Sequence, residues 1–197
     1  MAKYTGYVTI PITSYDAWKN ATNGNGYDAD GYYGCQCWDF AAEFWWNVGF
    51  PQGYPVAGGT EYAYMVWDDR NSNISYGGIT YFDLVYNASE IKKGDIVVFS
   101  PTSVNPAGHI GFADVNYGDW TPDPNQPYEF PVLSENNNGT PDPAGGSYVN
   151  LHGYDIRLFR GAFRYKPWEE PTPPPTRREN KFPWVLYANC LRLKRQL

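Results

Sequence analysis

The residues of this chain that could carry out covalent chemistry are a cysteine, a histidine and a glutamate, which occur in that order. Cys37 stands just before an apolar run, His109 opens the stretch His-Ile-Gly-Phe-Ala, and Glu135 directly follows the stretch Phe-Pro-Val-Leu-Ser. A histidine can take the proton of a cysteine thiol, which then attacks a carbonyl carbon, and can return that proton to the leaving amine. A carboxylate on the far imidazole nitrogen fixes the tautomer of the ring. This set of residues predicts acyl transfer at an amide bond.

Cys37 is expected at or near the start of a helix. Apolar residues recur at helical spacing from Phe40 to Val48, and Gly49 is placed to end the helix. The unpaired backbone N–H groups and the positive end of the dipole at a helix N-terminus would stabilise a thiolate, which is the nucleophilic form. The alternative is a buried structural cysteine, because free cysteines are often buried.

His109 is expected to begin a strand. Strand alternation puts His109 and Gly111 on one face and Ile110 and Phe112 on the other, so the histidine face has small neighbours and leaves room for the cysteine helix or a substrate. His152 lies in a Leu-His-Gly context typical of a turn, which makes His109 the preferred base. The alternative for His109 is a core histidine that bonds to a backbone carbonyl.

Glu135 and Asn137 are two residues apart and share a face if the preceding strand continues through them. One of them can accept a hydrogen bond from the far imidazole nitrogen, and the other can support the ring or the loop. The alternative for both is turn chemistry, because Asn138-Gly139 follows at once.

The stretch Asp28-Ala29-Asp30-Gly31 indicates the start of a loop that binds calcium through oxygen atoms. Alternating carboxylates supply ligands, and the glycine permits a sharp bend. The later glutamate of an EF-hand is absent, so this is not an EF-hand. The alternative is an acidic turn that caps the following helix.

The composition predicts a single domain with one core, because the 197 residues are 42% apolar. Aromatic residues make up 18% of the chain, so we expect an aromatic-lined groove or exposed face, although packing accounts for most of the rings equally well.

The net charge is −6, whereas residues 176–197 hold six basic residues and one acidic residue, so the rest of the chain is strongly acidic. An acidic body argues against nucleic acid as the main partner.

The three cysteines, Cys35, Cys37 and Cys190, make no disulfide framework, and with two histidines they fall short of a zinc site. The N-terminus has no apolar segment of the kind found in secretory signals, and no run is long enough to span a membrane. Residues 167–176 are proline-rich and predict a stiff linker. We therefore expect a catalytic domain at 1–166 and a short basic amphipathic tail at 177–197, too small to fold alone.

Several motifs agree in order and spacing with one known family. The run Asp-x-Asp-Gly-x-Tyr-Gly-x-Gln-Cys-x-Asp occupies residues 28–39, a Gly-Asp-Ile-Val-Val-Phe strand precedes Gly-His-Ile, and Glu-Asn-Asn follows. The chain resembles the CHAP family, the cysteine- and histidine-dependent amidohydrolases/peptidases that cut bacterial peptidoglycan, over roughly residues 15–166. The resemblance implies an α+β, papain-like fold of the NlpC/P60 type, with N-terminal helices packed on an antiparallel sheet.

The resemblance also implies the roles of individual residues. Cys37 rather than Cys35 would be the nucleophile, His109 the base, Glu135 the third member and Asn137 an accessory polar residue. The oxyanion would lie near the Cys37 backbone N–H, with the Gln36 side chain as a candidate second donor. A structural Ca²⁺ would be held by Asp28, Asp30, Tyr32, Gly34 and Asp39. Gly34 would offer only its carbonyl. No organic cofactor is implied.

The function that the resemblance implies is that of a phage lysin: a monomeric peptidoglycan hydrolase acting as an endopeptidase or as an N-acetylmuramoyl-L-alanine amidase. Without a signal, such an enzyme would be released by a holin or be carried on a virion. One alternative is a module that binds cell wall or carbohydrate without catalysis, which the aromatic content favours. Another is an enzyme of the same fold that acts on a different amide.

Overall fold

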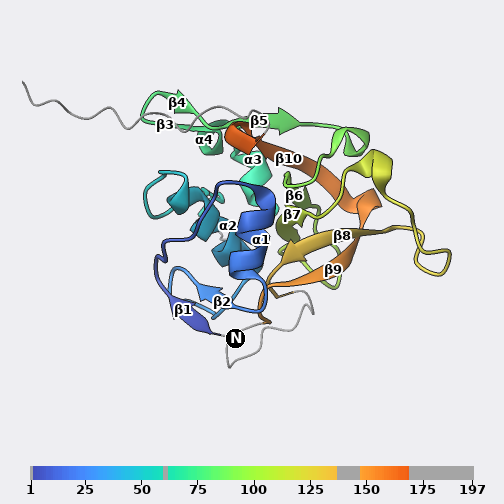
Figure 1. The fold of residues 1–197 in the computed structure, drawn as a ribbon, viewed down its shortest axis with the longest axis horizontal. Helices are drawn as coiled ribbons and strands as arrows, with labels where there is room; N and C mark the ends of the chain where they lie inside the picture. Colours follow the sequence, from blue (N-terminus) through green and yellow to red (C-terminus); the bar gives the residue numbers. More distant parts are fainter. Residues whose placement is uncertain (1, 60–61, 137–146, 169–197) are drawn as a thin grey trace, which may run out of the picture.

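The computed structural model describes residues 2–59, 62–136 and 147–168. The centre of this part of the chain is a six-stranded antiparallel sheet with helices against one of its faces (Figure 1). Its strands follow the spatial order β5 (Phe82–Val85), β10 (Phe159–Tyr165), β6 (Ile96–Phe99), β7 (His109–Ala113), β8 (Glu129–Ser134) and β9 (Asn150–Asp155).

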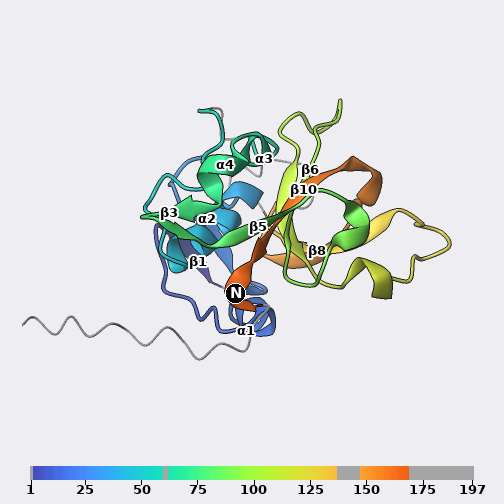
Figure 2. The same cartoon turned by 90° about the horizontal axis from the view of Figure 1, so that it is seen from above.

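Two helices cover that face. α1 spans Tyr15–Thr22 and is capped by Ser14, whose hydroxyl accepts a hydrogen bond from the Ala17 backbone N–H at 3.1 Å. α2 spans Cys37–Asn47, so Cys37 is its first residue, as predicted. Gly49 follows with a φ of 114°, a conformation that favours glycine and ends the helix. Seen from above, α1 and α2 lie on the same side of β6 and β8 (Figure 2).

Shorter elements complete the fold. They are a parallel pair, β1 (Lys3–Thr5) with β2 (Gly26–Asp28), an antiparallel pair, β3 (Ser75–Tyr76) with β4 (Ile79–Thr80), the helices α3 (Met65–Asp68) and α4 (Arg70–Asn73), and the 3-10 turns η1 (Ala88–Glu90), η2 (Tyr117–Asp119), η3 (Ile156–Leu158) and η4 (Lys166–Trp168).

Residues Tyr7–Ile10 lie beside α2 and do not form a strand. The backbone N–H of Val8 donates to Glu43 at 3.1 Å, and that of Ile10 donates to Asn47 at 2.8 Å. Both acceptors are side chains on α2, so the backbone groups that a sheet would have paired are paired with a helix instead. The alternation here places apolar side chains beside α2.

The core between α2 and the sheet is aromatic. Phe40 and Phe44 of α2 each lie 5.2 Å from the Phe112 ring, and Trp18 of α1, which is fully buried, lies 5.4 Å from Phe40. Burying each such side chain contributes roughly 2–3 kcal/mol. α2 therefore packs on the Phe112 face of β7. The sequence left open whether the helix would approach the histidine face, and the structure places the helix on the opposite one.

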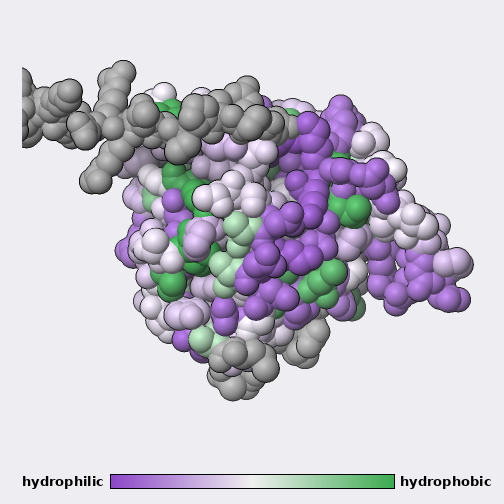
Figure 3. All heavy atoms as spheres, viewed as in Figure 1, coloured by the Kyte–Doolittle hydropathy of each residue, from purple (hydrophilic) through white to green (hydrophobic). Residues whose placement is uncertain are grey.

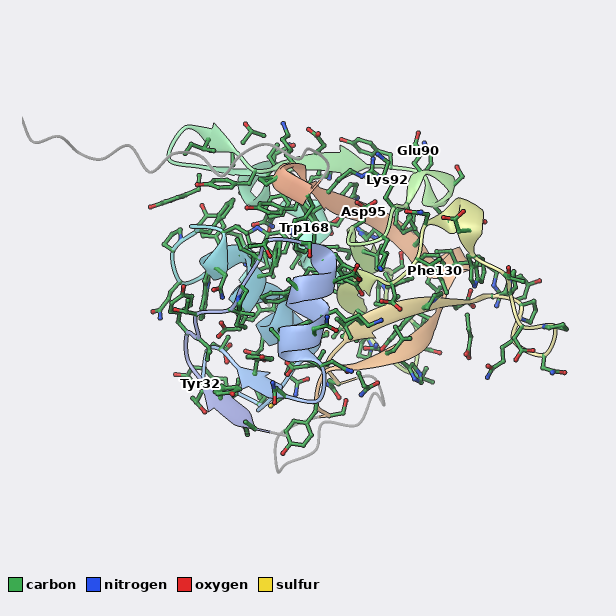
Figure 4. The ribbon with its side chains drawn as sticks, in the orientation of Figure 1. Tyr32, Glu90, Lys92, Asp95, Phe130 and Trp168 are labelled. Atoms are coloured by element: carbon green, nitrogen blue, oxygen red, sulfur yellow. The ribbon has the colours of Figure 1, made fainter. Side chains whose placement is uncertain are left out.

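The described part of the chain ends beside α1. The Trp168 indole N–H donates to the Ile12 carbonyl at 2.8 Å, and Figure 4 shows the ring at the upper end of α1. The proposed tail at 177–197 lies outside the described residues, so the division into domain, linker and tail stays a prediction. No helix within the described ranges is long and apolar enough to cross a membrane.

Candidate active site

Cys37 lies where α2 meets the start of β7. The sulfur receives backbone hydrogen bonds from Ile110 and Trp38, and the side chain is 9% exposed. Because Ile110 directly follows His109, the thiol lies beside the end of β7 that carries the histidine. The structure thus places the predicted nucleophile against the residue that follows the predicted base in β7.

The surroundings of Cys37 do not favour a thiolate. Burial raises the pKa of Cys37 to about 12, and the nearby carboxylates of Asp39 and Glu135 raise it further, whereas the Ile110 and Trp38 amides lower it. Burial thus opposes the thiolate that the helix N-terminus was expected to favour. The stabilised thiolate stays a prediction.

His109 is held by two side chains of neighbouring strands. Its Nε2 lies 2.8 Å from the Ser134 hydroxyl, and its ring stacks on the Tyr154 ring at 4.0 Å between centroids and 11° between planes. His109 is 2% exposed and Ser134 is fully buried. Neither Ser134 nor Tyr154 was singled out from the sequence.

Glu135 is bound by the backbone of β2. Its Oε1 accepts a hydrogen bond from the Tyr27 backbone N–H at 2.5 Å, and its buried Oε2 has no partner among the described residues. The assignment of Glu135 as the residue on the far imidazole nitrogen stays a prediction. Burial raises the pKa of Glu135 well above its usual range.

The Gln36 amide joins two loops next to the nucleophile. Its Nε2 donates to the Tyr33 carbonyl at 2.8 Å, and its Oε1 accepts from Asn136 Nδ2 at 2.5 Å. Asn136 has a φ of 51°, a left-handed conformation that asparagine tolerates better than most residues. Sequence reasoning missed Asn136, although the Asn-rich turn was a signal for such a residue. Asn137 lies outside the described residues, and the oxyanion role of Gln36 stays a prediction.

The acidic loop brings three carboxylates together. One oxygen from each of Asp28, Asp30 and Asp39 lies within 4.8 Å of the others. Asp39 also organises the backbone: Oδ1 accepts from the Ala29 N–H at 2.9 Å, and Oδ2 accepts from the Gln36 N–H at 2.9 Å at the start of α2. The capping role that the sequence left as an alternative is thus present.

The same carboxylates suit a hard divalent cation. Oδ1 of Asp28 is buried without a hydrogen-bond partner, and Lys3 approaches the other oxygen at 3.7 Å. Burial, and secondarily the charge of Asp30, raise the pKa of Asp39 to about 8. Clustered carboxylate oxygens, one of them buried without a hydrogen-bond partner, are the donor set that Ca²⁺ prefers, so the residues present fit this ion.

The two predicted backbone ligands lie in the same loop. The Tyr32 N–H donates to Asp30 Oδ1 at 2.7 Å, and Gly34 has a φ of 71°. The Tyr32 side chain is 66% exposed and lies at the edge of the molecule (Figure 4). Carbonyl ligation by Tyr32 and Gly34 stays a prediction.

A pocket of about 490 Å³ opens beside the nucleophile, lined among others by Asp30, Trp38, Trp46, Gln52, Pro55 and Val56. Its wall is fixed, because the Trp38 indole N–H donates to the Pro55 carbonyl at 3.1 Å and the buried Asn73 amide pairs with both backbone groups of Val56. Its two tryptophans match the expected aromatic-lined groove. On the face in Figure 3, apolar residues gather on the α2 side and polar residues over the β8–β9 side.

Comparisons with known proteins identify the family. Residues 16–122 match the family model of the CHAP domain, and this stretch contains Cys37, His109 and the acidic loop. A "D-alanyl-L-alanine endopeptidase" of Streptococcus phage B30 is 34% identical over 108 residues, which are 54% of this chain and 23% of that protein. The chain thus matches about a quarter of the length of this relative.

A solved structure is also similar. The wild-type endolysin LysIME-EF1 superposes with a TM-score of 0.55 at 20% identity, over 81% of this chain and 66% of the other. At this identity the likeness concerns the fold, and it confirms the predicted α+β, papain-like architecture.

Proposed function

Because the chain belongs to the CHAP domain family, we propose that it is a cysteine-dependent hydrolase of bacterial peptidoglycan, of the phage lysin type. The observation that carries this proposal is the position of the Cys37 thiol, at the first residue of α2 and beside the end of β7 that carries His109. A binding module would need no thiol and imidazole at one place. A monomer that reaches the wall after holin-type lysis or on a virion fits this proposal.

In the proposed mechanism His109 takes the proton of Cys37 as the sulfur attacks the carbonyl carbon of the substrate amide. The negative oxygen that forms lies near the Cys37 backbone N–H, one of the unpaired donors at the start of α2. His109 then protonates the leaving amine, and water hydrolyses the thioester. Burial raises the pKa of Cys37, so the mechanism assigns removal of the thiol proton to His109.

The bond cut is proposed to lie in the peptide part of peptidoglycan. The phage B30 relative is named as a D-alanyl-L-alanine endopeptidase. Trp38 follows the nucleophile and lines the 490 Å³ pocket, so this pocket takes the substrate residues on one side of the scissile amide. The muramoyl–alanine amide is the other candidate, and the masses of the products distinguish the two.

Calcium is proposed to bind at Asp28, Asp30 and Asp39, with Tyr32 and Gly34 as backbone ligands. When bound, it supplies positive charge that holds the acidic loop and the start of α2 in place. The chain's own contribution is the Asp39 carboxylate, which ties the Gln36 N–H to the loop.

The test is digestion of purified peptidoglycan by the wild type, Cys37→Ala and the matched control Cys35→Ala, with mass spectrometry of the products. Cys35 is a buried cysteine two residues from the nucleophile, so its replacement controls for loss of a nearby thiol. We expect the wild type and Cys35→Ala to release new amine termini, and Cys37→Ala to lose at least about a thousandfold in rate.

Two outcomes contradict the proposal. Equal hydrolysis by Cys37→Ala would exclude this thiol as the nucleophile. Intact walls from several bacteria, with wild type and Cys37→Ala both sedimenting with them, would identify a wall-binding protein instead.

A further inference from the structure

The base His109 is enclosed by side chains of β8 and β9. The Ser134 hydroxyl lies 2.8 Å from Nε2, and the Tyr154 ring lies parallel to the imidazole. The Tyr154 ring also stacks on Phe99 at 5.2 Å, and Phe99 is the β6 residue that pairs with His109. One tyrosine therefore covers both members of a cross-strand pair.

The sheet leaves space for this arrangement only because Gly111 lacks a side chain. A Cβ at Gly111 would lie 2.6 Å from the Ser134 Cβ, which is closer than two such atoms come. Ser134 thus lies directly across from Gly111, and its hydroxyl reaches the imidazole two residues earlier on β7. The small residue noted on the histidine face makes room for Ser134.

Tyr154 belongs to the same site as the nucleophile. A negative charge on Cys37 raises the pKa of the Tyr154 phenol, although burial raises it more. The tyrosine ring is therefore close enough to the thiol to feel its ionisation.

We propose that Ser134 and Tyr154 are the positioning residues of His109. The Ser134 hydroxyl accepts the Nε2–H, so Nδ1 is the nitrogen that takes the Cys37 proton, and the Tyr154 ring holds the plane of the imidazole. The Glu135 Oε1 accepts from the Tyr27 backbone N–H, and the Nε2 contact is made by Ser134. The inference rests on the proposed function for its role in catalysis, whereas the tautomer it assigns does not.

The tautomer is measured directly by ¹⁵N NMR of the imidazole rings at a pH where they are neutral. The chain has two histidines, so His152 serves as an internal reference. We expect wild type and Glu135→Gln to show His109 in the Nε2–H form, and Ser134→Ala to show a mixture of both forms. The proposal would be overturned if Ser134→Ala kept His109 fully in the Nε2–H form. It would also be overturned if Glu135→Gln lost that form while Ser134→Ala kept it.

Kinetics separate positioning from folding. We expect Ser134→Ala to lower both the rate of Cys37 alkylation by iodoacetamide and kcat about tenfold, with KM unchanged. Ser134→Thr keeps the hydroxyl and should restore both rates. Tyr154→Leu should slow the same steps, whereas Tyr154→Phe keeps the ring and should not. Equal rates for Ser134→Ala and Ser134→Thr, with both variants folded by circular dichroism, would contradict the role of the hydroxyl.

The two proposals fail in different ways. If no wall is cut but the tautomer and the alkylation rate depend on Ser134, the peptidoglycan function fails and the positioning role stands. If walls are cut by a Cys37-dependent reaction that Ser134→Ala leaves unchanged, the positioning role fails alone.

Discussion

At the scale of single residues, the buried carboxylates of this chain are held at an electrostatic cost. Glu43 on α2 is fully buried; its Oε2 accepts from the Val8 N–H, and its Oε1 has no partner among the described residues. Burial raises its pKa from 4.5 to about 7. The charged form is therefore disfavoured in the folded state relative to the unfolded chain.

This shift predicts a pH-dependent effect of Glu43→Gln. The folded-state pKa lies above the unfolded value, so the wild type loses stability as the pH rises from about 4.5 to about 7. The neutral amide cannot ionise and still accepts from Val8. We expect Glu43→Gln to have a free energy of unfolding about 1–3 kcal/mol above wild type at pH 8 and equal to it at pH 4. Urea unfolding at both pH values measures this, and a constant difference at the two would contradict it.

The residues that sequence reasoning missed are those whose roles depend on strand register. Cys37 and His109 could be placed because helix and strand starts are local signals. Ser134 could not, since choosing between it and Glu135 requires the pairing of Leu133 with Phe112. Once that pair is known, Leu133 and Glu135 share the core face, and Ser134 is the residue left to face the histidine.

At the scale of elements, the acidic loop and α2 act as one unit. Asp39 both caps the helix and joins Asp28 and Asp30 in the carboxylate cluster. A structural cation at this cluster would therefore fix the first turn of the helix that carries Cys37.

Calcium is expected to raise the unfolding temperature of the wild type by several degrees, because an ion that binds the folded state alone stabilises it by mass action. Asp28→Asn should remove most of this increase, since Asp28 supplies the buried unpartnered oxygen. Asp123→Asn, an exposed aspartate outside the cluster, is the matched control. Calorimetry with calcium and with a chelator measures the effect. Equal shifts in all three proteins would exclude a specific ion at this loop.

The fold class could be predicted from the sequence, whereas some elements could not. The apolar strand Ile96–Phe99 follows from a local pattern and is confirmed. Tyr7–Ile10 alternates like a strand, but Glu43 and Asn47 take its backbone hydrogen bonds. A sequence pattern specifies which side chains are buried, and it leaves open which element covers them.

At the scale of the whole molecule, the sheet depends on a strand that comes late in the sequence. β10 lies between β5 and β6 and pairs with both, through Ala162 with Val85 on one side and Val97 on the other. The CHAP match ends at residue 122, before β8, β9 and β10.

Truncation is therefore expected to show a sharp boundary. A chain cut after residue 155 lacks β10 and should lose its cooperative unfolding transition, because β5 is left without its partner in the sheet. A chain cut after residue 168 keeps every contact described above and should unfold like the full chain. Thermal unfolding followed by near-UV circular dichroism compares the three, and a cooperative transition in the shorter chain would contradict the expectation.

The late position of β10 also bears on synthesis at the ribosome. The segment with Cys37 and the base at His109 emerges first, but Ser134, Tyr154 and the central strand follow only later. A nascent chain therefore carries the nucleophile well before it can form the site that uses it. The constellation of Cys37, His109, Ser134 and Tyr154 can therefore assemble only after translation has passed Tyr165.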